Sequence, residues 1–472
     1  MTFGPNSWTP VPGAFIQKVG KDVHAYKNEI GPKAVVVMVG LPARGKSYIV
    51  KKLKRYLSWL GFKTMVFNVG NRRRTCAAEA EVKTGCKQNH TSDFFNPNNE
   101  DAKSLRDQLA MDTLNEVITW LNEGGKVGIL DATNSTKARR QRIIDRCSRE
   151  SDINILFVES ICTDPKVLAR NMQLKLSGPD YRDQESESAS EDFQARVANY
   201  ERAYQTIEDD EDEDIQYCKI INVGKKVIAH NIQTFLAGQC VFYLMNMNLA
   251  ERQIWLTRHG ESLDNQVGKI GGDAPLSDAG CEYAEALAAF MAEQQRNFRC
   301  SETSTPPQLT VWTSMLRRAV ETAEHFNPEE FDIKHMKFLN EIYAGICEGM
   351  TYKEIEERYP EDFKARATSK FYYRYPGMGG ESYCDVIQRL CPVIVELERT
   401  RNSVLIVTHR ALTRSLLAYF MDIPLRQMTN LDIPLNALYC IEAKPYGNVL
   451  IKYEYSHVTK SFSQVENDVQ QI

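Results

Sequence analysis

The stretch Gly40-Leu41-Pro42-Ala43-Arg44-Gly45-Lys46-Ser47 decides the fold of the first half of the chain. It follows an apolar run at 34–39 and precedes a segment with helical spacing at 48–60. A glycine-rich loop between a strand and a helix, ending in Gly-Lys-Ser, surrounds phosphate oxygens with backbone N–H groups and a helix N-terminus. We expect Lys46 to reach the β- and γ-phosphates and the Ser47 hydroxyl to hold Mg²⁺. A plain glycine turn is the alternative, but every fixed position and both flanking elements are present, so the sequence predicts a nucleoside triphosphate site.

Strands and helices alternate through the first half of the chain. The expected strands there are 34–39, 63–68, 127–131, 154–159 and 217–222. The expected helices include 101–123 and 137–150. This alternation predicts a mainly parallel sheet covered by helices, with ligands at the carboxyl ends of the strands.

A second alternating pattern begins near residue 253. Its expected strands are 253–256, 309–312, 403–408 and 437–441. Its expected helices are 277–295, 317–325, 383–400 and 411–421. Neither half repeats the other, so the sequence predicts an α/β protein with two unrelated, doubly wound domains. The expected division is a tail at 1–32, domains at 33–248 and 249–455 and a tail at 456–472, with 241–248 joining the halves.

Composition narrows the possible partners and compartment. The formal net charge is −4, from 58 basic and 62 acidic residues, so neither nucleic acid nor a membrane surface is the expected main partner. The 12 cysteines form no C-x-x-C pair, and neither a secretory signal nor an apolar run of about 18 residues is visible. These features predict a cytoplasmic protein. The seven consecutive acidic residues at 208–214 are expected to form a solvated loop.

A carboxylate and a group of arginines extend the phosphate loop's chemistry. Asp131 ends an apolar strand, where it can hold Mg²⁺ through water or take the proton of an attacking hydroxyl, although a simple helix cap is the alternative. The arginines that we expect to bind an anionic acceptor are Arg72, Arg73, Arg74, Arg106, Arg139 and Arg140. A phosphorylated small molecule is the predicted class of acceptor.

The second half brings histidines and arginines to strand ends. Arg258-His259-Gly260 follows one strand, His409 follows another, and Arg317-Arg318 follows a third. A lone histidine is usually structural, but this context is typical of an imidazole that accepts a phosphoryl group between arginines. Glu341 is the candidate acid for the leaving alcohol.

These motifs resemble known families. The second half resembles the histidine phosphatase (phosphoglycerate mutase-like) superfamily through Arg258-His259-Gly260 and His409. From about residue 33 to 455, the chain resembles the bifunctional 6-phosphofructo-2-kinase/fructose-2,6-bisphosphatase family. Besides the phosphate loop, the matching signatures are Phe67-Asn68-Val69-Gly70, Asp131-Ala132-Thr133-Asn134, Pro179-Asp180-Tyr181, Arg258-His259-Gly260-Glu261-Ser262, Ile270-Gly271-Gly272-Asp273 and Gly380-Glu381-Ser382-Tyr383.

For the first half, the resemblance implies a P-loop kinase fold that transfers a phosphoryl group from MgATP to the 2-hydroxyl of fructose 6-phosphate. The implied nucleotide positions are Gly40 to Tyr48 (Tyr48 included), Asn171 and Lys175. The implied fructose 6-phosphate positions are Arg73, Arg74, Arg106, Thr133, Arg139, Lys175, Arg196 and Tyr200. Lys46, Asp131 and Cys162 are implied near the chemistry, with Ser47 and Asp131 at Mg²⁺.

For the second half, the resemblance implies a histidine phosphatase fold acting on fructose 2,6-bisphosphate. His259 would carry the phosphate, Glu341 would donate the proton, and His409 would stabilise the transition state. The implied bisphosphate positions are Arg258, Asn265, Gly271, Arg318, Tyr352, Arg374, Tyr383, Arg410 and Arg414. The resemblance also implies a cytosolic homodimer.

Three departures from the family pattern concern this second site. Tyr343 stands where the family usually has Asp, and Arg410 stands where a Gln usually follows the second histidine. The stretch 376–380 is longer and lacks a lysine that many members use on the substrate. A bisphosphatase is still expected, with product release slowed by the extra cation.

Three functions therefore remain open at this point. The first is a bifunctional enzyme that makes and removes fructose 2,6-bisphosphate and so regulates glycolysis. The second is a kinase with a weak or silent phosphatase half, and the third is a nucleotide-sensing binding protein without turnover.

Overall fold

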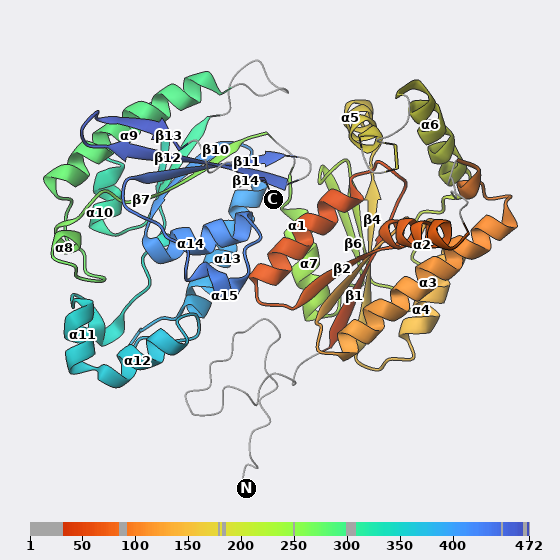
Figure 1. Cartoon of the computed structure of the whole chain (residues 1–472), viewed down its shortest axis with the longest axis horizontal. Coiled ribbons are helices and arrows are strands. Elements are labelled where there is room, and N and C mark those ends of the chain that lie inside the picture. Colours follow the sequence, from red (N-terminus) through yellow and green to blue (C-terminus); the bar gives the residue numbers. More distant parts are fainter. Residues whose placement is uncertain are drawn as a thin grey trace, which may run out of the picture. The chain divides into compact units, whose positions relative to one another are not determined.

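The computed structural model describes residues 32–84, 92–177, 180–181, 186–248, 251–298, 308–444, 447–465 and 470–471. The chain divides into two compact units (Figure 1). Unit 1 comprises Met1–Ser58 and Phe62–Met247, and unit 2 comprises Trp59–Gly61 and Asn248–Ile472. Residues 1–31 of the expected N-terminal tail lie outside the described residues.

Unit 1 is built on a six-stranded sheet in the order β2-β3-β1-β4-β5-β6. The strands are β1 (Lys33–Val39), β2 (Thr64–Asn68), β3 (Val127–Asp131), β4 (Ile153–Ile161), β5 (Tyr217–Ile221) and β6 (Lys226–His230). The first five run parallel, and β6, which the sequence analysis missed, pairs antiparallel with β5 at the edge. Residues 34–39 of β1 are all buried because helices cover both faces of the sheet.

Seven helices of unit 1 follow or flank these strands. They are α1 (Lys46–Trp59), α2 (Val69–Thr84), α3 (Glu100–Asn122), α4 (Lys137–Cys147), α5 (Pro165–Leu176), α6 (Ser186–Ala203) and α7 (Phe235–Met245). Figure 1 shows α1 and α7 on one side of the sheet and α3 and α4 on the other. The expected connection at 241–248 contains the end of α7, where Val241, Tyr243 and Leu244 are buried, and the division between the units falls after Met247.

Unit 2 contains a larger mixed sheet, ordered β13-β12-β11-β7-β10-β8-β9, with β14 paired to β12. Its strands are β7 (Gln253–Arg258), β8 (Leu309–Thr313), β9 (Asp332–His335), β10 (Ser403–Thr408), β11 (Ala437–Lys444), β12 (Gly447–Ser456), β13 (Ser461–Gln464) and β14 (Gln470–Gln471). The four strands β7, β10, β8 and β9 are parallel, and the others are antiparallel. Residues 456–472, expected to be a tail, therefore include two short strands of this sheet.

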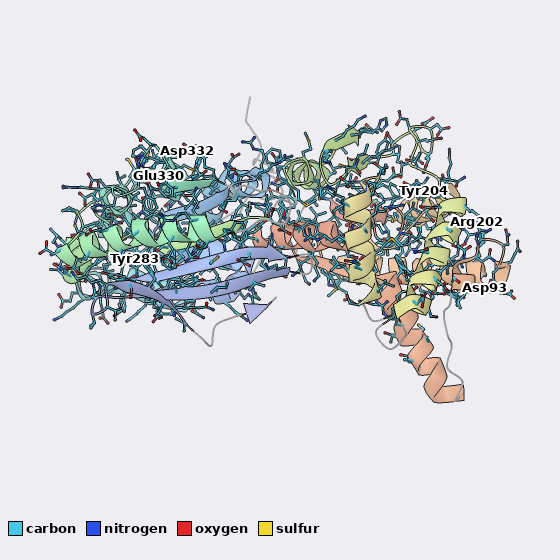
Figure 2. The ribbon with its side chains drawn as sticks, turned by 90° about the horizontal axis from the view of Figure 1, so that it is seen from above. Asp93, Arg202, Tyr204, Tyr283, Glu330 and Asp332 are labelled. Carbon is cyan, nitrogen blue, oxygen red and sulfur yellow. The ribbon has the colours of Figure 1, made fainter. Side chains whose placement is uncertain are left out.

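Helices cover both faces of this second sheet. They are α8 (Leu263–Gln266), α9 (Asp278–Asn297), α10 (Arg317–Thr322), α11 (Tyr352–Arg358), α12 (Pro360–Thr368), α13 (Tyr383–Arg399), α14 (Arg410–Phe420) and α15 (Leu425–Met428). Tyr283 of α9 is fully buried, and its hydroxyl lies 2.6 Å from Thr257 Oγ1 on β7 (Figure 2). This bond fixes α9 to the strand that leads to His259.

The acidic run at 208–214 is mostly exposed, as the sequence predicted, but Glu211 is an exception. The Glu211 side chain is only 2% exposed and pairs with the fully buried Arg140, whose Nε donates to Glu211 Oε2 at 2.7 Å. Tyr217 donates to Asp209 in the same run. Part of the run is therefore internal to unit 1. Over the described residues, no helix is long and apolar enough to cross a membrane.

Candidate active sites

The phosphate loop lies between β1 and α1, at the carboxyl edge of the unit 1 sheet. Gly40 has φ +132°, and a Cβ there would come within 2.5 Å of Ser160 O on the neighbouring strand β4, so only glycine fits. Gly40 N donates to Thr133 O at 2.9 Å, and Asn171 Nδ2 donates to Ala43 O at 2.9 Å. The loop is thus held by β4, by the chain after β3 and by α5.

Lys46 is buried inside this loop. Its ammonium donates to Gly40 O at 2.8 Å and to Leu41 O at 2.6 Å. Burial lowers the pKa of Lys46 to about 7, although the charge of Asp131 acts in the opposite direction. An incoming phosphate would supply the negative charge that this ammonium lacks.

Asp131 ends β3, and Asn68 ends the neighbouring strand β2 in register with it. Asn68 Nδ2 donates to Asp131 Oδ2 at 2.6 Å. Burial raises the pKa of Asp131, against the charge of Lys46 and the Asn68 hydrogen bond. The sequence analysis quoted Asn68 in a motif but did not name it as a site residue; the signal was its equivalent place at a strand end.

The residues present fit a magnesium ion with few protein ligands. The Ser47 hydroxyl is near enough to the Asp131 carboxylate to lower its pKa slightly, so two oxygen groups lie beside the loop lysine. Among the described residues, no group of three or more His, Cys, Asp or Glu side chains could hold a metal by itself. Mg²⁺ typically takes one or two protein oxygens and completes its shell with phosphates and water.

Three of the expected acceptor arginines converge on one carboxylate, Asp180. Its oxygens lie 2.8 Å from Arg73, 3.0 Å from Arg74 and 3.1 Å from Arg196. Burial alone would raise the pKa of Asp180, but the guanidinium charges hold it well below its usual range. The ring of Phe95 packs against these arginines, with the Arg196 guanidinium 3.9 Å from the ring centroid. We call Arg73, Arg74 and Arg196 the acceptor arginines.

The remaining acceptor positions lie around this cluster. The Arg106 guanidinium lies 5.7 Å from the ring centroid of Phe94. Burial lowers the pKa of Arg106, and Tyr200 and Arg139 are near enough to influence it. Arg139 Nε donates to Asp107 at 2.8 Å. Lys175 experiences the charges of both Asp131 and Asp180, which places it between the nucleotide and acceptor positions.

Two other expected positions of unit 1 lie near these groups. Cys162 is buried directly after β4. Tyr48 is in α1, where the Lys52 ammonium lies 5.2 Å from its ring centroid. Arg72 instead pairs with Glu116 and Asp112, and Arg140 is fully buried against Glu211. The expectation that Arg140 binds the acceptor is therefore wrong, because its side chain is fully buried against Glu211, whereas the expectation for Arg72, which pairs with carboxylates of α3, stays a prediction.

In unit 2, His259 follows β7 and is 3% exposed. Its Nδ1 lies 2.6 Å from Gly260 O, and since a carbonyl can only accept, Nδ1 carries the proton. Nε2 therefore keeps its lone pair and accepts from Arg318 Nε at 3.0 Å. Burial, with Arg318 and Arg258, holds the pKa of His259 well below its usual range. This is an uncharged imidazole with its nucleophilic nitrogen directed at a guanidinium.

His409 follows β10 in the same way. Arg258 and Thr408 are register partners, so the two histidines extend adjacent parallel strands. Ser314 Oγ lies 2.7 Å from His409 Nε2 and accepts from Leu316 N, and we assign its hydroxyl hydrogen to the contact with the imidazole. His409 Nδ1 then holds the ring proton and finds no partner within the described part of the chain. A phosphoryl oxygen could accept from this buried N–H group.

Arginines surround the histidine pair. Burial lowers the pKa of Arg258 to about 10, with Arg410, Arg414 and Arg318 acting in the same direction and Glu341 opposing them. Arg318 also donates to Gly272 O at 2.8 Å, and Arg414 donates to Tyr383 OH at 3.1 Å. A cluster of four guanidiniums around two neutral imidazoles is an anion site.

Glu341 lies beside this cluster. Its Oε1 accepts from Ile342 N at 2.9 Å and from Ala411 N at 3.3 Å. Ala411 lies in the first turn of α14, two residues after His409, so the carboxyl is near the second histidine. The structure brings Arg258, His259, Glu341 and His409 to one edge of the sheet, as expected.

Two further cations join this site that the sequence analysis did not name. Arg366, at the end of α12, donates to Tyr352 OH at 3.1 Å. Burial and the charges of Arg414, Arg366 and Arg410 lower the pKa of Lys370 to about 8. Lys370 thus adds a cation beside Arg366, Arg410 and Arg414, and its Nζ donates to Thr429 O at 3.0 Å.

Arg374 is placed differently from the other expected contacts. Arg374 NH1 donates to Gly380 O at 2.8 Å, and its other amino group pairs with Asp385. Its guanidinium is therefore engaged in holding the loop before α13. Its expected substrate contact stays a prediction.

The expected contacts Asn265 and Gly271 both lie on the segment that follows β7. Asn265 completes a capping box with Ser262 at the start of α8. Gly271 has φ +69°, and a Cβ there would come within 2.0 Å of the Glu348 carboxylate, which accepts from Gly272 N at 2.7 Å. Glycine is required at 271 because that carboxylate fills the space.

Two of the departures from the family pattern, Tyr343 and Arg410, have exposed side chains. The Tyr343 side chain is exposed, while its backbone exchanges hydrogen bonds with Glu381. Arg410 lies 3.4 Å from Asp432, and its side chain is 48% exposed. Neither change displaces His259, Glu341 or His409.

A nucleotide loop with a catalytic-type carboxylate and a histidine–arginine anion site together define a protein with two phosphoryl-transfer centres. Residues 21–251 match the family model of 6-phosphofructo-2-kinase, and residues 254–455 match that of the histidine phosphatase superfamily, branch 1.

Curated relatives match both units. The chain is 48% identical over 468 residues to 6-phosphofructo-2-kinase 1 of Saccharomyces cerevisiae, which covers 96% of this chain and 56% of that protein. It is 45% identical over 483 residues to a probable 6-phosphofructo-2-kinase of Schizosaccharomyces pombe, covering 92% and 71%. It is 44% identical over 428 residues to the 6-phosphofructo-2-kinase/fructose-2,6-bisphosphatase of Caenorhabditis elegans, covering 90% of each chain. The chain belongs to the 6-phosphofructo-2-kinase/fructose-2,6-bisphosphatase family.

Proposed function

We propose that the chain phosphorylates fructose 6-phosphate at its 2-hydroxyl with MgATP in unit 1 and hydrolyses fructose 2,6-bisphosphate in unit 2, and so regulates glycolysis. The observation that carries this proposal is the presence of both centres with their reactive groups in place: Lys46 beside Asp131, and His259 Nε2 beside Arg318. The family relationship supports the same two substrates.

In unit 1, the loop amides and Lys46 bind the triphosphate, and the acceptor arginines bind the 6-phosphate of the sugar. Mg²⁺ held by Ser47 and Asp131 would neutralise phosphate charge. Asp131 has a pKa raised by burial, so it is a stronger base than an exposed carboxylate and can take the proton of the 2-hydroxyl. Lys46 stabilises the charge that develops on the transferred group.

In unit 2, His259 Nε2 attacks the phosphorus at the sugar's 2-position. The Nε2–P bond forms while the P–O bond to the sugar breaks, and Glu341 gives its proton to the departing oxygen. Arg258, Arg318 and His409 Nδ1–H bind the phosphoryl oxygens. Water then attacks the phosphohistidine, with Glu341 taking its proton, and the products are fructose 6-phosphate and phosphate.

Two variants test the proposal on the purified full chain. Lys46→Met should abolish synthesis from ATP and fructose 6-phosphate while sparing hydrolysis, and His259→Ala should do the reverse. Lys51→Met and His325→Ala change exposed residues of the same type and should leave both rates unchanged. Loss of both activities in either site variant, or no ATP consumption dependent on fructose 6-phosphate, would contradict two independent centres.

The names of some relatives favour a second candidate, a kinase whose phosphatase half turns over slowly. The Saccharomyces cerevisiae and Schizosaccharomyces pombe relatives are named for the kinase alone. Fructose 2,6-bisphosphate labelled at its 2-phosphate distinguishes the two candidates. Only the bifunctional enzyme should transfer the label to His259 and release it as phosphate at a rate comparable to that of the kinase reaction.

The same proposal includes a homodimer in the cytosol. Family membership supports both, and the described residues contain no candidate membrane span. Light scattering of the purified chain tests the oligomeric state.

A further inference from the structure

The segment that carries Glu341 has little structure of its own. It leaves the short 3-10 turn at Lys337–Leu339, and residues 340–344 belong to no helix or strand. A proton donor on such a segment needs support from outside, because a misplacement of about 1 Å can cost about 100-fold in rate.

Arg389, on the buried side of α13, supplies much of that support. Its NH1 donates to Phe338 O at 2.6 Å, and its NH2 donates to Glu341 O at 3.1 Å. These two bonds hold the carbonyl of Phe338, three residues before Glu341, and the carbonyl of Glu341 itself.

Glu381 completes the arrangement. Arg389 Nε and NH2 donate to its two carboxylate oxygens at 2.8 and 3.1 Å, a fork-to-fork pair. The same carboxylate accepts from Tyr343 N at 2.9 Å, and Glu381 N donates to Tyr343 O at 2.9 Å. The backbone is therefore bonded before, at and after Glu341 by one ion pair.

We propose that Arg389 and Glu381 form a brace that positions Glu341 for proton transfer in unit 2. Neither residue is among the groups to which the family resemblance assigns a role in substrate binding or chemistry. Both side chains are mostly buried, 18% and 20% exposed, so the pair is stronger than a surface ion pair. The inference rests on the proposed bisphosphatase function and adds positioning residues to it.

The brace also accounts for the tolerance of Tyr343 at a position where the family usually has Asp. Glu381 binds the backbone N–H and C=O of residue 343, not its side chain, and that side chain is exposed. The position of Glu341 is thus independent of the side chain two residues later.

A double-mutant cycle on the full chain tests the brace. Arg389→Gln should lower kcat for fructose 2,6-bisphosphate by about 10- to 100-fold and change KM by less than about threefold. In a Glu341→Gln background, where the proton donor is absent, Arg389→Gln should lower kcat almost no further. Arg399→Gln, an exposed arginine ten residues later on α13 that pairs with Glu396, is the matched control and should leave kcat unchanged.

Two further measurements separate positioning from loss of folding. Arg389→Lys should restore part of kcat, since one cation can still bond a carbonyl, and Arg389→Gln should speed hydrogen exchange at the amide of Tyr343. An equal loss of kcat in both backgrounds, or a kcat for Arg389→Gln within about twofold of wild type, overturns the brace. A wild-type chain without phosphohistidine or hydrolysis instead overturns the proposed function, and the brace with it.

Discussion

His259 and His409 lie with their ring centroids 5.0 Å apart, each as the first residue after a strand of one parallel pair. Adjacent parallel strands in register bring their carboxyl ends to the same edge of the sheet. Two residues 150 positions apart in the sequence are therefore neighbours because each directly follows its strand. The same rule brings Asn68 to Asp131 in unit 1.

Binding of ATP should be coupled to proton uptake. Lys46 has a pKa of about 7 in the free site, so above that pH it is mostly neutral, and the phosphates should raise its pKa and charge it. Titration calorimetry at about pH 8, in buffers of different ionisation enthalpy, should show uptake approaching about one proton. Lys46→Met should remove the uptake and Lys51→Met should not; uptake that persists in Lys46→Met would assign it to another group.

Asn68→Ala should impair the kinase by weakening the control of Asp131. Loss of the hydrogen bond removes an influence that lowers the pKa of Asp131, so the acid limb of the kcat/KM profile should move to higher pH by about half a unit or more. Asn115→Ala, at an exposed site on α3, is the control. A profile that falls without moving would show that Asn68 acts on something other than Asp131.

The KM for fructose 2,6-bisphosphate should rise in alkali. Lys370 is charged below its pKa of about 8 and loses that charge above it, so binding of an anion should weaken across this range. Lys370→Arg should flatten the rise, and Lys370→Met should raise KM about tenfold or more at every pH. Lys364→Met, exposed on α12, should behave as wild type; a rise that survives in Lys370→Arg would contradict the assignment.

Glu211→Ala should destabilise unit 1. The change leaves the guanidinium of Arg140 buried without its carboxylate, which typically costs about 3–5 kcal/mol. Urea unfolding monitored in unit 1 measures this cost, and Glu213→Ala, exposed in the same acidic run, should cost less than about 0.5 kcal/mol. Equal effects of the two substitutions would mean that Arg140 finds another partner.

The sequence predicted the parts of the fold whose signal is local. The run at 34–39, the phosphate loop and the residues after 258 and 408 each combine an apolar strand with a distinctive end, and the strands lie where they were expected. The strands β6, β9 and β12 were missed because they are half-exposed edges or hairpin partners without a continuous apolar run.

From the residue pattern alone, the site residues were predictable mainly where a strand end fixed them, and the resemblance supplied most of the others. Arg366, Lys370 and Arg374 lie within nine residues of one another, and the sequence contains nothing that tells which guanidinium turns toward Tyr352 and which pairs with Asp385. Glu211 was indistinguishable from its acidic neighbours until Arg140, 71 residues away, was seen to be buried against it.

The carboxylate of Asp180 has a consequence for the proposed binding of the sugar phosphate. Three guanidiniums that would repel one another are held together by one carboxylate of the protein itself. Their ordering is completed when the chain folds, so a ligand phosphate encounters a preorganised cradle and loses less affinity to immobilising flexible arginines.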